Sequence, residues 1–391
     1  MLFGATLINR LGAFVAPFLA LYLGHDRGLD AARVGTIVAL FGAGAVIGGP
    51  VGGLLADRVG RRKTIVLGMM SGAAAMVAMV GAREPLSLMP ATFALGFTNE
   101  LSRPATSAMV ADLVPDADRP RAYAALYWAV NLGVAFASVI AGLVAGVAFE
   151  WLFLVDALTC LACGAVIYLA LPETRPSAGA PLARFALSDV ALPFRDRRFR
   201  VFFGASALVA VVFYQFNVAM PLDMRSHGIS TYTYGLLVAL NGVLVVLLSP
   251  FSAPLMLRFS RSSGLSLAAL LTGIGFGMFA LGGSVALYAA AMVVLTLGEI
   301  AFAPLHSAVV ASLAPPHLRG TYQGAFLLSL SLAACVSPLV GGALLARGAG
   351  SYLWFGCFLL GLLAAAIYRS LPLSPPVGER VPASAELSVQ V

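Results

Sequence analysis

The chain repeats its own sequence at an offset of 200 residues. The segment RPATSAMVADLVPDADR, which contains Pro104, aligns with APLHSAVVASLAPPHLR, which contains Pro304, and GTIVALFG from Gly35 aligns with GLLVALNG from Gly235. One register that holds across so much of the chain is typical of a duplicated unit. We therefore expect two halves with the same architecture.

Twelve apolar stretches run through the two halves, and each is long enough to cross a hydrocarbon core of ~30 Å as a helix. Charged residues make up only 10% of the chain, far below the roughly 25% of a soluble domain. The sequence lacks the alternating pattern of barrel strands. It predicts an all-α membrane protein with 12 transmembrane helices in two six-helix bundles related by the internal repeat, with spans at 2–24, 31–55, 64–82, 86–111, 122–147, 150–171, 200–224, 231–257, 264–282, 285–313, 322–346 and 350–371.

One long polar break divides these spans into six and six. It begins LPETRPSAGAP, is rich in Pro, Ser and Ala, and ends in the basic cluster RDRRFR, which is typical of a linker. The last residues contain Pro and Ser without an apolar period, which favours a disordered tail. The predicted organisation is an N-terminal bundle (1–171), a cytoplasmic linker (172–199), a C-terminal bundle (200–371) and a disordered cytoplasmic tail (372–391).

The basic residues indicate the orientation, because cytoplasmic loops carry an excess of Lys and Arg. With the N-terminus inside, 17 basic residues fall in inward loops and tails and 5 in outward loops. Both termini are therefore expected in the cytoplasm. A single Lys beside 23 Arg is typical of a GC-rich bacterium, so a bacterial inner membrane is expected, with a monomer in it. The net charge of +7 follows from this asymmetry, and nucleic acid is not an expected partner.

The most specific short motif lies between the second and third spans, where the chain reads GGLLADRVGRRKT. It closely resembles the G-x-L-a-D-r-x-G-r-r loop of the major facilitator superfamily, and the resemblance covers nearly the whole chain. It implies that superfamily's fold, transport by alternating access, and a loop that closes the cytoplasmic side. The second half keeps Arg258 and Arg261 but has Leu257 in place of the acid, so such a gate is one-sided. On this resemblance the cytoplasmic gate loop comprises Gly53, Asp57, Arg58, Gly60, Arg61 and Arg62.

Other segments resemble the 12-helix drug:proton antiporter branch of that superfamily. The first span loosely matches the branch's motif at Leu11, Gly12, Pro17 and Leu21, and LPETRP closes the sixth span. The fifth span lacks the Gly-Pro pair of the antiporter signature, and the fourth has Arg103 deeper than the Arg of the branch. The resemblance implies efflux of small amphipathic or drug-like compounds, with the proton gradient as energy source and no cofactor.

Ionisable side chains inside the spans are the first candidates for a site, because each costs at least ~2.5–3.5 kcal/mol at bilayer depth. Glu299 lies near the middle of the tenth span, and His306 follows seven residues later on the same helix face. Glu299 is a candidate for proton coupling or for contact with a cationic substrate; the alternative is an acid held permanently neutral by a hydroxyl. His306 is either a proton relay or a structural histidine. Asp156 and Asp223 lie nearer the outer ends of their spans and are less decisive.

Four more polar residues lie in the first and fourth spans. Glu100 and Arg103 are three residues apart and can pair on one helix face, as a structural salt bridge or as one that breaks during transport. Arg10, preceded by Asn9, lies about nine residues into the first span. Its side chain either reaches the cytoplasmic surface or lines a central cavity, where it would favour an anionic group.

Amide and aromatic residues mixed in one span suit the wall of an adaptable cavity, although such aromatic residues also serve as packing. Cys160 and Cys163 share a helix face, but no further thiol or histidine pair completes a zinc site, so no metal is expected. The cavity-lining candidates are Tyr214, Gln215 and Asn217 of the seventh span, together with Asn131 and Asn241.

Several classes of protein are excluded by missing motifs. An ATP-driven pump needs Gly-Lys-Ser/Thr in a phosphate loop, and the only lysine is Lys63 in the gate loop. The sequence has neither a zinc-protease motif nor a nucleophile elbow, so no enzyme is expected. The expected function is proton-coupled export of a small molecule. The alternatives are a facilitator or proton symporter for a polar or anionic metabolite, and a non-transporting sensor on the same fold.

Overall fold

The computed structural model describes residues 2–13, 15–115, 118–144, 149–174, 191–256, 258–315 and 318–373, and these residues contain helices and short connections but no strand. The predicted linker between 175 and 190 and the predicted tail from 374 lie outside them. The first half comprises α1 (Leu2–Leu11), α2 (Val15–Leu21), the π-helix η1 (Tyr22–Asp26), α3 (Ala31–Val59), α4 (Arg61–Gly81), α5 (Pro85–Leu113), α6 (Arg119–Val144) and α7 (Glu150–Ala170). The second half comprises the short 3₁₀ turns η3 (Pro193–Arg195), η4 (Tyr214–Asn217) and η5 (Phe279–Leu281), and the helices α8 (Arg197–Phe213), α9 (Ala219–Ser226), α10 (Thr231–Met256), α11 (Arg261–Met278), α12 (Val285–Leu313), α13 (Arg319–Ala346) and α14 (Gly350–Ser370).

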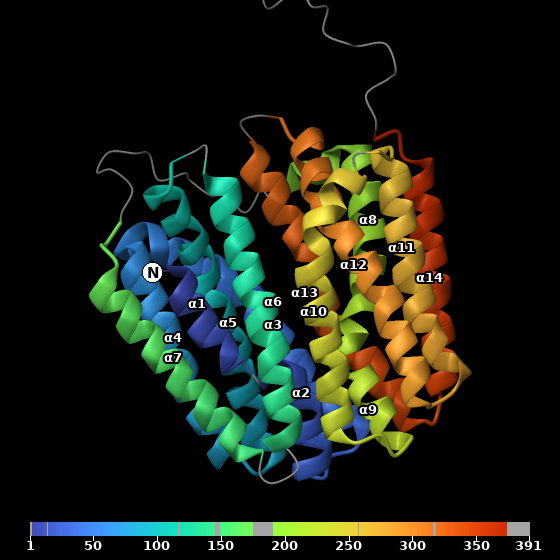
Figure 1. The fold of residues 1–391 in the computed structure, drawn as a ribbon, viewed down its shortest axis with the longest axis horizontal. Helices are drawn as coiled ribbons and strands as arrows, with labels where there is room; N and C mark the ends of the chain where they lie inside the picture. The colour runs from blue at the N-terminus through green and yellow to red at the C-terminus, as the bar shows by residue number, and fades with distance from the viewer. Residues whose placement is uncertain are drawn as a thin grey trace, which may run out of the picture.

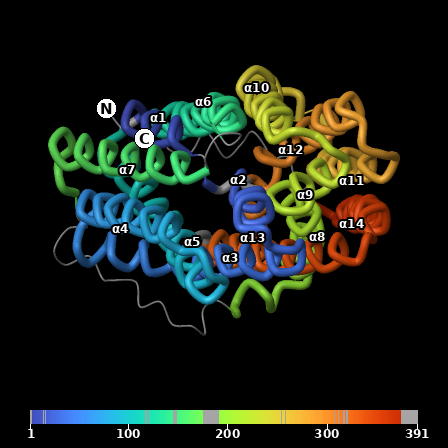
Figure 2. Tube along the Cα trace, turned by 90° about the horizontal axis from the view of Figure 1, so that it is seen from below, coloured from blue at the N-terminus to red at the C-terminus, as the bar shows by residue number. Residues whose placement is uncertain are grey.

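The helices form two bundles side by side, with α1 to α7 in one and α8 to α14 in the other (Figure 1). An end-on view shows the two groups on either side of a central region near α2, α9 and α13 (Figure 2). Ten of the described segments are long and apolar enough to cross a membrane. The other two predicted spans are the first, which is broken, and α5, which carries several charges. The all-α membrane fold is therefore confirmed, and it accommodates twelve crossings.

The first and seventh spans were predicted as continuous helices, and the structure breaks both. The first consists of α1, α2 and η1, and the seventh of α8, η4 and α9. The third residue of each later piece is a proline, Pro17 in α2 and Pro221 in α9. A proline has no N–H, and its ring clashes with the carbonyl group four residues earlier. This accounts for the loss of helical bonding at Ala13 and Asn217.

The most extensive contacts between the bundles are those of α3 with α13 and of α6 with α10, and α2 also contacts α9 and η4. A Cβ added at Gly35 of α3 would lie 2.2 Å from the carbonyl oxygen of Pro338 in α13, and one added at Gly235 of α10 would lie 2.3 Å from that of Ser138 in α6. The same 200-residue offset relates the two crossings. Only glycine lets the backbones approach so closely.

The bundles share a core at one end of the molecule and have separate cores at the other. We call the end with the connections α3–α4, α5–α6, α10–α11 and α12–α13 the basic end; it is at the top of Figure 1. Toward the opposite end, one apolar cluster spans both bundles and includes Phe18 and Tyr234, whose ring centroids are 5.3 Å apart. Toward the basic end, Met109 and Leu305 belong to different clusters, one in each bundle. The bundles are therefore joined mainly at the opposite end.

Each half also closes on itself at the basic end. The carboxylate of Glu173 accepts the backbone N–H groups of Arg62 at 3.0 Å and Lys63 at 3.1 Å, and so caps the N-terminus of α4. In the second half, the hydroxyl of Ser262, in the first turn of α11, donates to the carbonyl oxygen of Leu371. Glu173 thus ties the end of the sixth span to the start of the third.

Candidate functional site

Glu299 lies halfway along the 29-residue helix α12 and bonds to the neighbouring helix α10. The Nδ2 of Asn241 donates to Oε2 of Glu299 at 2.9 Å and to the hydroxyl of Thr296, one turn earlier on α12, also at 2.9 Å. Among the residues that the structure describes, the hydrogen-bond partner of this carboxyl group is thus an amide and not a basic side chain. The carboxyl group can therefore gain or lose a proton without breaking an ion pair.

Tyr127 of α6 is a residue of the N-terminal bundle that lies near the carboxyl group of Glu299. It lies within electrostatic range of Glu299 and is 38% exposed. Asn131, one turn further along α6, donates to the carbonyl oxygen of Tyr127 at 2.9 Å. Because α6 packs against α10, groups from both bundles converge near Glu299.

Glu100 and Arg103 form the ion pair that their spacing predicts. An Nη1 of Arg103 lies 3.1 Å from Oε1 of Glu100, and the amide of Asn99 donates to the same oxygen at 3.2 Å. The side chain of Arg103 is 67% exposed. Tyr214, in η4 of the other bundle, is within electrostatic range of both charges. The pair therefore lies where the two bundles face each other.

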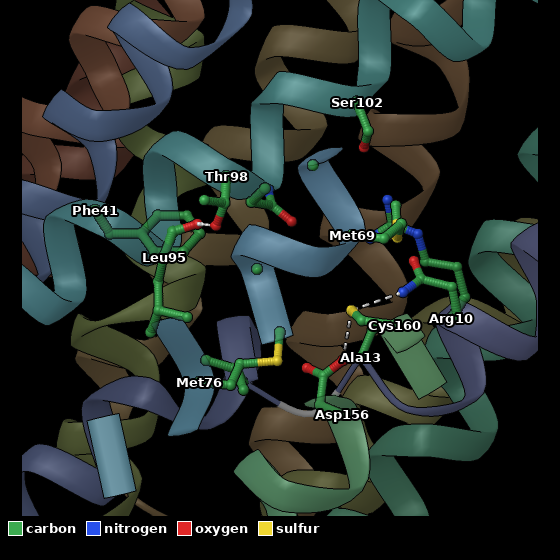
Figure 3. Close-up of a pocket in the computed structure, with 15 residues that line it drawn as sticks. Arg10, Ala13, Phe41, Met69, Met76, Leu95, Thr98, Ser102, Asp156 and Cys160 are labelled. Atoms are coloured by element: carbon green, nitrogen blue, oxygen red, sulfur yellow. Dashed lines mark hydrogen bonds between the residues drawn. The ribbon is translucent and has the colours of Figure 1, made fainter. Parts of the chain in front are cut away.

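Asn9 and Arg10 line a pocket inside the N-terminal bundle (Figure 3). The amide of Asn9 donates to the sulfur of Cys160 at 3.2 Å, and Asp156 lies one turn before Cys160 on α7. The Nε of Arg10 is buried and has no hydrogen-bond partner among the described residues. Arg10 is thus turned to the interior of its bundle and not to the cytoplasmic surface. The pocket has about 70 Å³ of space, and its other polar or sulfur-bearing lining residues are Met69, Met76, Thr98, Asn99 and Ser102.

His306 packs against a different neighbour from Glu299. Its Nδ1 lies 3.1 Å from the carbonyl oxygen of Phe302 on the same helix. The imidazole ring stacks on Phe302, with centroids 5.2 Å apart, and on Phe326 of α13, with centroids 4.9 Å apart. Glu299 therefore bonds toward α10, whereas His306 packs toward α13.

The amide candidates of the seventh span lie at its break. Gln215 is 1% exposed, and its Oε1 would lie 2.3 Å from a Cβ added at Gly341 of α13. Tyr214 and Asn217 are half-buried in η4. Of the five cavity-lining candidates, Asn241 and Asn131 are the two that the structure brings into the surroundings of Glu299.

The gate loop is organised around Arg61, which is buried. Its guanidinium lies 3.4 Å from Asp57 and 3.0 Å from Asp112 at the end of α5, and it donates to the carbonyl oxygen of Ala56 at 3.1 Å. Gly60 has a φ of 114°, which side chains rarely allow. These contacts join the ends of three helices of the N-terminal bundle.

Of the other residues of the gate loop, some contact the protein and some are exposed to solvent. Arg62 donates to the carbonyl oxygen of Leu171 at 3.1 Å, and its guanidinium lies 5.1 Å from the ring centre of Tyr168. Asp57 and Arg58 are exposed at the basic end. Gly53 faces α5, where an added Cβ would lie 3.9 Å from Pro104.

Sequence reasoning missed three members of these arrangements. Thr296 lies one turn before Glu299, so helical spacing alone could have suggested it. Tyr127 and Asp112 come from other helices and carry no local signal. Among the described residues, no group of three or more His, Cys, Asp or Glu side chains could hold a metal ion.

The structure has two helical bundles built on one repeat, with broken first and seventh spans. Ionisable groups lie where the bundles meet. This combination is typical of a membrane transporter. The sequence profile of the Major Facilitator Superfamily matches residues 2–222 and 202–390. The chain belongs to this superfamily, and it is a transporter, not an enzyme.

Relatives of known sequence agree with this assignment. An uncharacterized MFS-type transporter of Bacillus subtilis, YttB, is 26% identical over 86% of this chain and 85% of its own length. The Na(+), Li(+), K(+)/H(+) antiporter of Planococcus maritimus is 26% identical over 86% and 87%. The multidrug resistance protein MdtH of Citrobacter koseri is 26% identical over 86% and 84%.

Solved structures share the fold. The nucleoside transporter NupG superposes with a TM-score of 0.81 at 15% identity, over 95% of this chain and all of that chain. A POT family transporter in complex with 5-aminolevulinic acid superposes with a TM-score of 0.79 at 18% identity, over 94% of this chain and 93% of that one. Identities this low establish a common architecture and no common substrate.

Proposed function

We propose that the protein exports small amphipathic compounds in exchange for protons, and that proton and substrate compete at Glu299. The observation that carries the proposal is the position of this carboxyl group, in the middle of α12, bonded to Asn241 and approached by Tyr127 from the other bundle. A carboxyl group at membrane depth is costly and is usually functional. The names of two relatives, a multidrug resistance protein and a cation/proton antiporter, support the same reading.

The exchange follows from the charge of one carboxyl group. When Glu299 releases its proton, the carboxylate attracts a cationic or polar substrate. The hydrogen bond from the amide N–H of Asn241 stabilises this charged form. When a proton returns, the neutral acid no longer holds the substrate. Because one group cannot serve both ligands at once, the flow of protons inward drives the substrate outward.

We place the basic end in the cytoplasm of a bacterium, in the inner membrane, because Lys and Arg are retained on that side. Both termini then lie in the cytoplasm. The bundles are joined at the opposite end and have separate cores at the basic end, so this arrangement corresponds to the state that loads substrate from the cytoplasm. One chain carries both halves, so we expect a monomer that works without a cofactor.

Dissipation of a pH gradient in everted membrane vesicles tests the proposal. The probes are lipophilic cations such as ethidium and tetraphenylphosphonium, and the proteins are the wild type, Glu299→Gln and Glu84→Gln. Glu84 is an exposed glutamate that precedes α5, so Glu84→Gln is a matched control for the loss of a carboxylate. We expect at least one probe to dissipate the gradient with the wild type and Glu84→Gln but not with Glu299→Gln.

Two outcomes would contradict this expectation. An equal response of wild type and Glu299→Gln would remove Glu299 from the coupling path and direct attention to Glu100 and Arg103. No response to any probe, with normal amounts of protein in the membrane, would reject antiport and favour a facilitator or symporter, which uptake assays with anionic metabolites would then test.

A second candidate function is exchange of monovalent inorganic cations for protons. Glu299 and Thr296 place a carboxyl and a hydroxyl oxygen around the same amide N–H group of Asn241, and hard cations prefer oxygen ligands. The relative from Planococcus maritimus bears such an activity in its name. Adding sodium, lithium or potassium salts to the same vesicles separates the two candidates, because only cation exchange predicts dissipation by these salts alone.

A further inference from the structure

The pocket in the N-terminal bundle holds a second buried carboxyl group, which the proposed exchange at Glu299 does not use. Asp156, on α7, is 4% exposed and forms part of the pocket wall. The thiol of Cys160 lies 3.9 Å from its Oδ1, and the same sulfur accepts the amide of Asn9. Figure 3 shows the side chains of Asp156 and Cys160 next to each other at one side of the pocket, with Arg10 nearby.

Arg10 supplies the positive charge of this pocket. It lies on α1, within electrostatic range of both Asp156 and Glu100. Glu100 already binds Arg103 at 3.1 Å, whereas the Nε of Arg10 is buried without a hydrogen-bond partner among the described residues. Arg10 therefore carries a buried positive charge within range of a carboxylate at Asp156.

The broken backbone of the first span also lines the pocket. Ala13 and Val15, on either side of the break, are among its lining residues, and an added Cβ at Gly12 would lie 2.0 Å from the hydroxyl of Thr159 on α7. Irregular backbone at membrane depth is tolerated where it is buried in protein or lines a watery cavity. The space of about 70 Å³ exceeds the ~10–15 Å³ that one water needs, so the pocket has room for water beside Asp156.

We propose that Asp156 is a second proton-binding site, which lies in the N-terminal bundle and is balanced by Arg10. The proton binds to a carboxylate oxygen of Asp156 and leaves to water in the pocket, and no other bond forms or breaks. Proton release leaves a carboxylate that attracts Arg10. Proton uptake removes that attraction and alters the balance of charge next to the break between α1 and α2.

The surroundings of Asp156 contain few other groups that could titrate in its place. The helix α4 contributes Met69 and Met76 to the pocket, and α2 contributes Val15, none of which titrates. Among the described residues, the charged or titratable groups near the pocket include Arg10 on α1, Glu100 and Arg103 on α5, and Cys160 and Cys163 on α7.

The use of this site in transport rests on the proposed proton exchange, and with it each bundle would carry one proton-binding carboxyl group. Proton binding itself needs no substrate and can be measured alone. The readout is the carboxylic C=O band in infrared difference spectra of the full-length protein in lipid, recorded between acidic and alkaline pH. The variants are Asp156→Asn, Asp156→Glu, Glu299→Gln, Arg10→Gln and Arg10→Lys.

We expect a C=O band that is lost in Asp156→Asn, shifted in frequency in Asp156→Glu and retained in Glu299→Gln. Arg10→Gln should move the titration midpoint of that band to higher pH, because the charged carboxylate has lost its partner, and Arg10→Lys should move it less. Superimposable spectra of wild type and a folded Asp156→Asn would overturn the proposal. If Asp156→Asn does not fold, an unchanged midpoint in Arg10→Gln overturns it as well. If transport fails to depend on Glu299 while the C=O band of Asp156 is present, the proposed function is contradicted and the proton-binding site at Asp156 is not.

Discussion

At the scale of single residues, Arg61 joins three helix ends at the basic end through Asp57, Asp112 and the carbonyl oxygen of Ala56. We expect Arg61→Ala to lower the free energy of unfolding by about 1–3 kcal/mol. This is less than the 3–5 kcal/mol for breaking a fully buried pair, because Asp57 is 53% exposed and Asp112 is 33% exposed. Denaturant unfolding of the purified protein in detergent measures the difference.

Arg58→Ala is the matched control, because Arg58 lies in the same loop and is exposed. A surface substitution of this kind changes stability by about 0.5 kcal/mol or less. Equal losses in the two variants would show that the contacts of Arg61 add nothing beyond the removal of a surface charge.

The candidate site could be predicted from the sequence only where the signal is local. The Glu100–Arg103 pair follows from a spacing of three residues, and the structure contains it. Glu299 stands out because a charge in an apolar span is costly. Its contact with Asn241 depends on the packing of α10 against α12, which no helical period reveals. Asp156 is a candidate because the structure places it in the wall of a pocket near Arg10, an arrangement that no spacing in the sequence predicts.

At the scale of helices, glycines determine how closely the bundles approach. We expect Gly35→Leu to drive α3 and α13 apart at the opposite end, because its Cβ would meet the backbone of Pro338 at 2.2 Å. Overpacking of this kind costs about 1–3 kcal/mol, which corresponds to a 5- to 150-fold change in the ratio of two conformations. The distance between spin labels at two exposed positions, Arg33 on α3 and Arg347 directly after α13, should increase.

Gly49→Leu is the control for this prediction. Gly49 lies on the same helix, α3, and a Cβ added there meets nothing within 4 Å. The label distance should stay at its wild-type value in this variant. A similar increase in both variants would mean that leucine disturbs α3 itself and not the contact between the bundles.

Helix positions were predictable from the sequence, whereas helix breaks were not. Apolar runs placed α12 at its observed bounds because a long apolar segment has few alternatives in a membrane. The breaks occur beside Pro17 and Pro221, yet Pro104 and Pro304 lie inside continuous helices. A proline weakens a helix locally, and neighbouring helices decide whether the bonding is lost.

At the scale of the whole molecule, the two halves share their helix arrangement but differ in the ionisable residues inside their spans. The crossings at Gly35 and Gly235 keep the repeat, and so do the breaks of the first and seventh spans. The ionisable candidates do not, because the 200-residue offset sets Glu299 against Asn99 and Asp156 against Gly356. The repeat therefore builds a scaffold with two similar bodies, and the positions where it has diverged carry the proposed chemistry.

Two bodies joined at one end are expected to exchange that contact for one at the other end. Spin-label pairs test this, with Arg121 and Arg258 at the basic end and Arg33 and Arg347 at the opposite end, each pair spanning both bundles. The four native cysteines, Cys160, Cys163, Cys335 and Cys357, are first replaced. We expect any change of pH or addition of a transported cation that shortens one distance to lengthen the other, because the bundles rotate as rigid units about the central region. Distances that rise and fall together would indicate swelling of the whole protein and would reject alternating access. Distances that never change, in a protein that still transports, would place the gate within a bundle, at the broken first or seventh span.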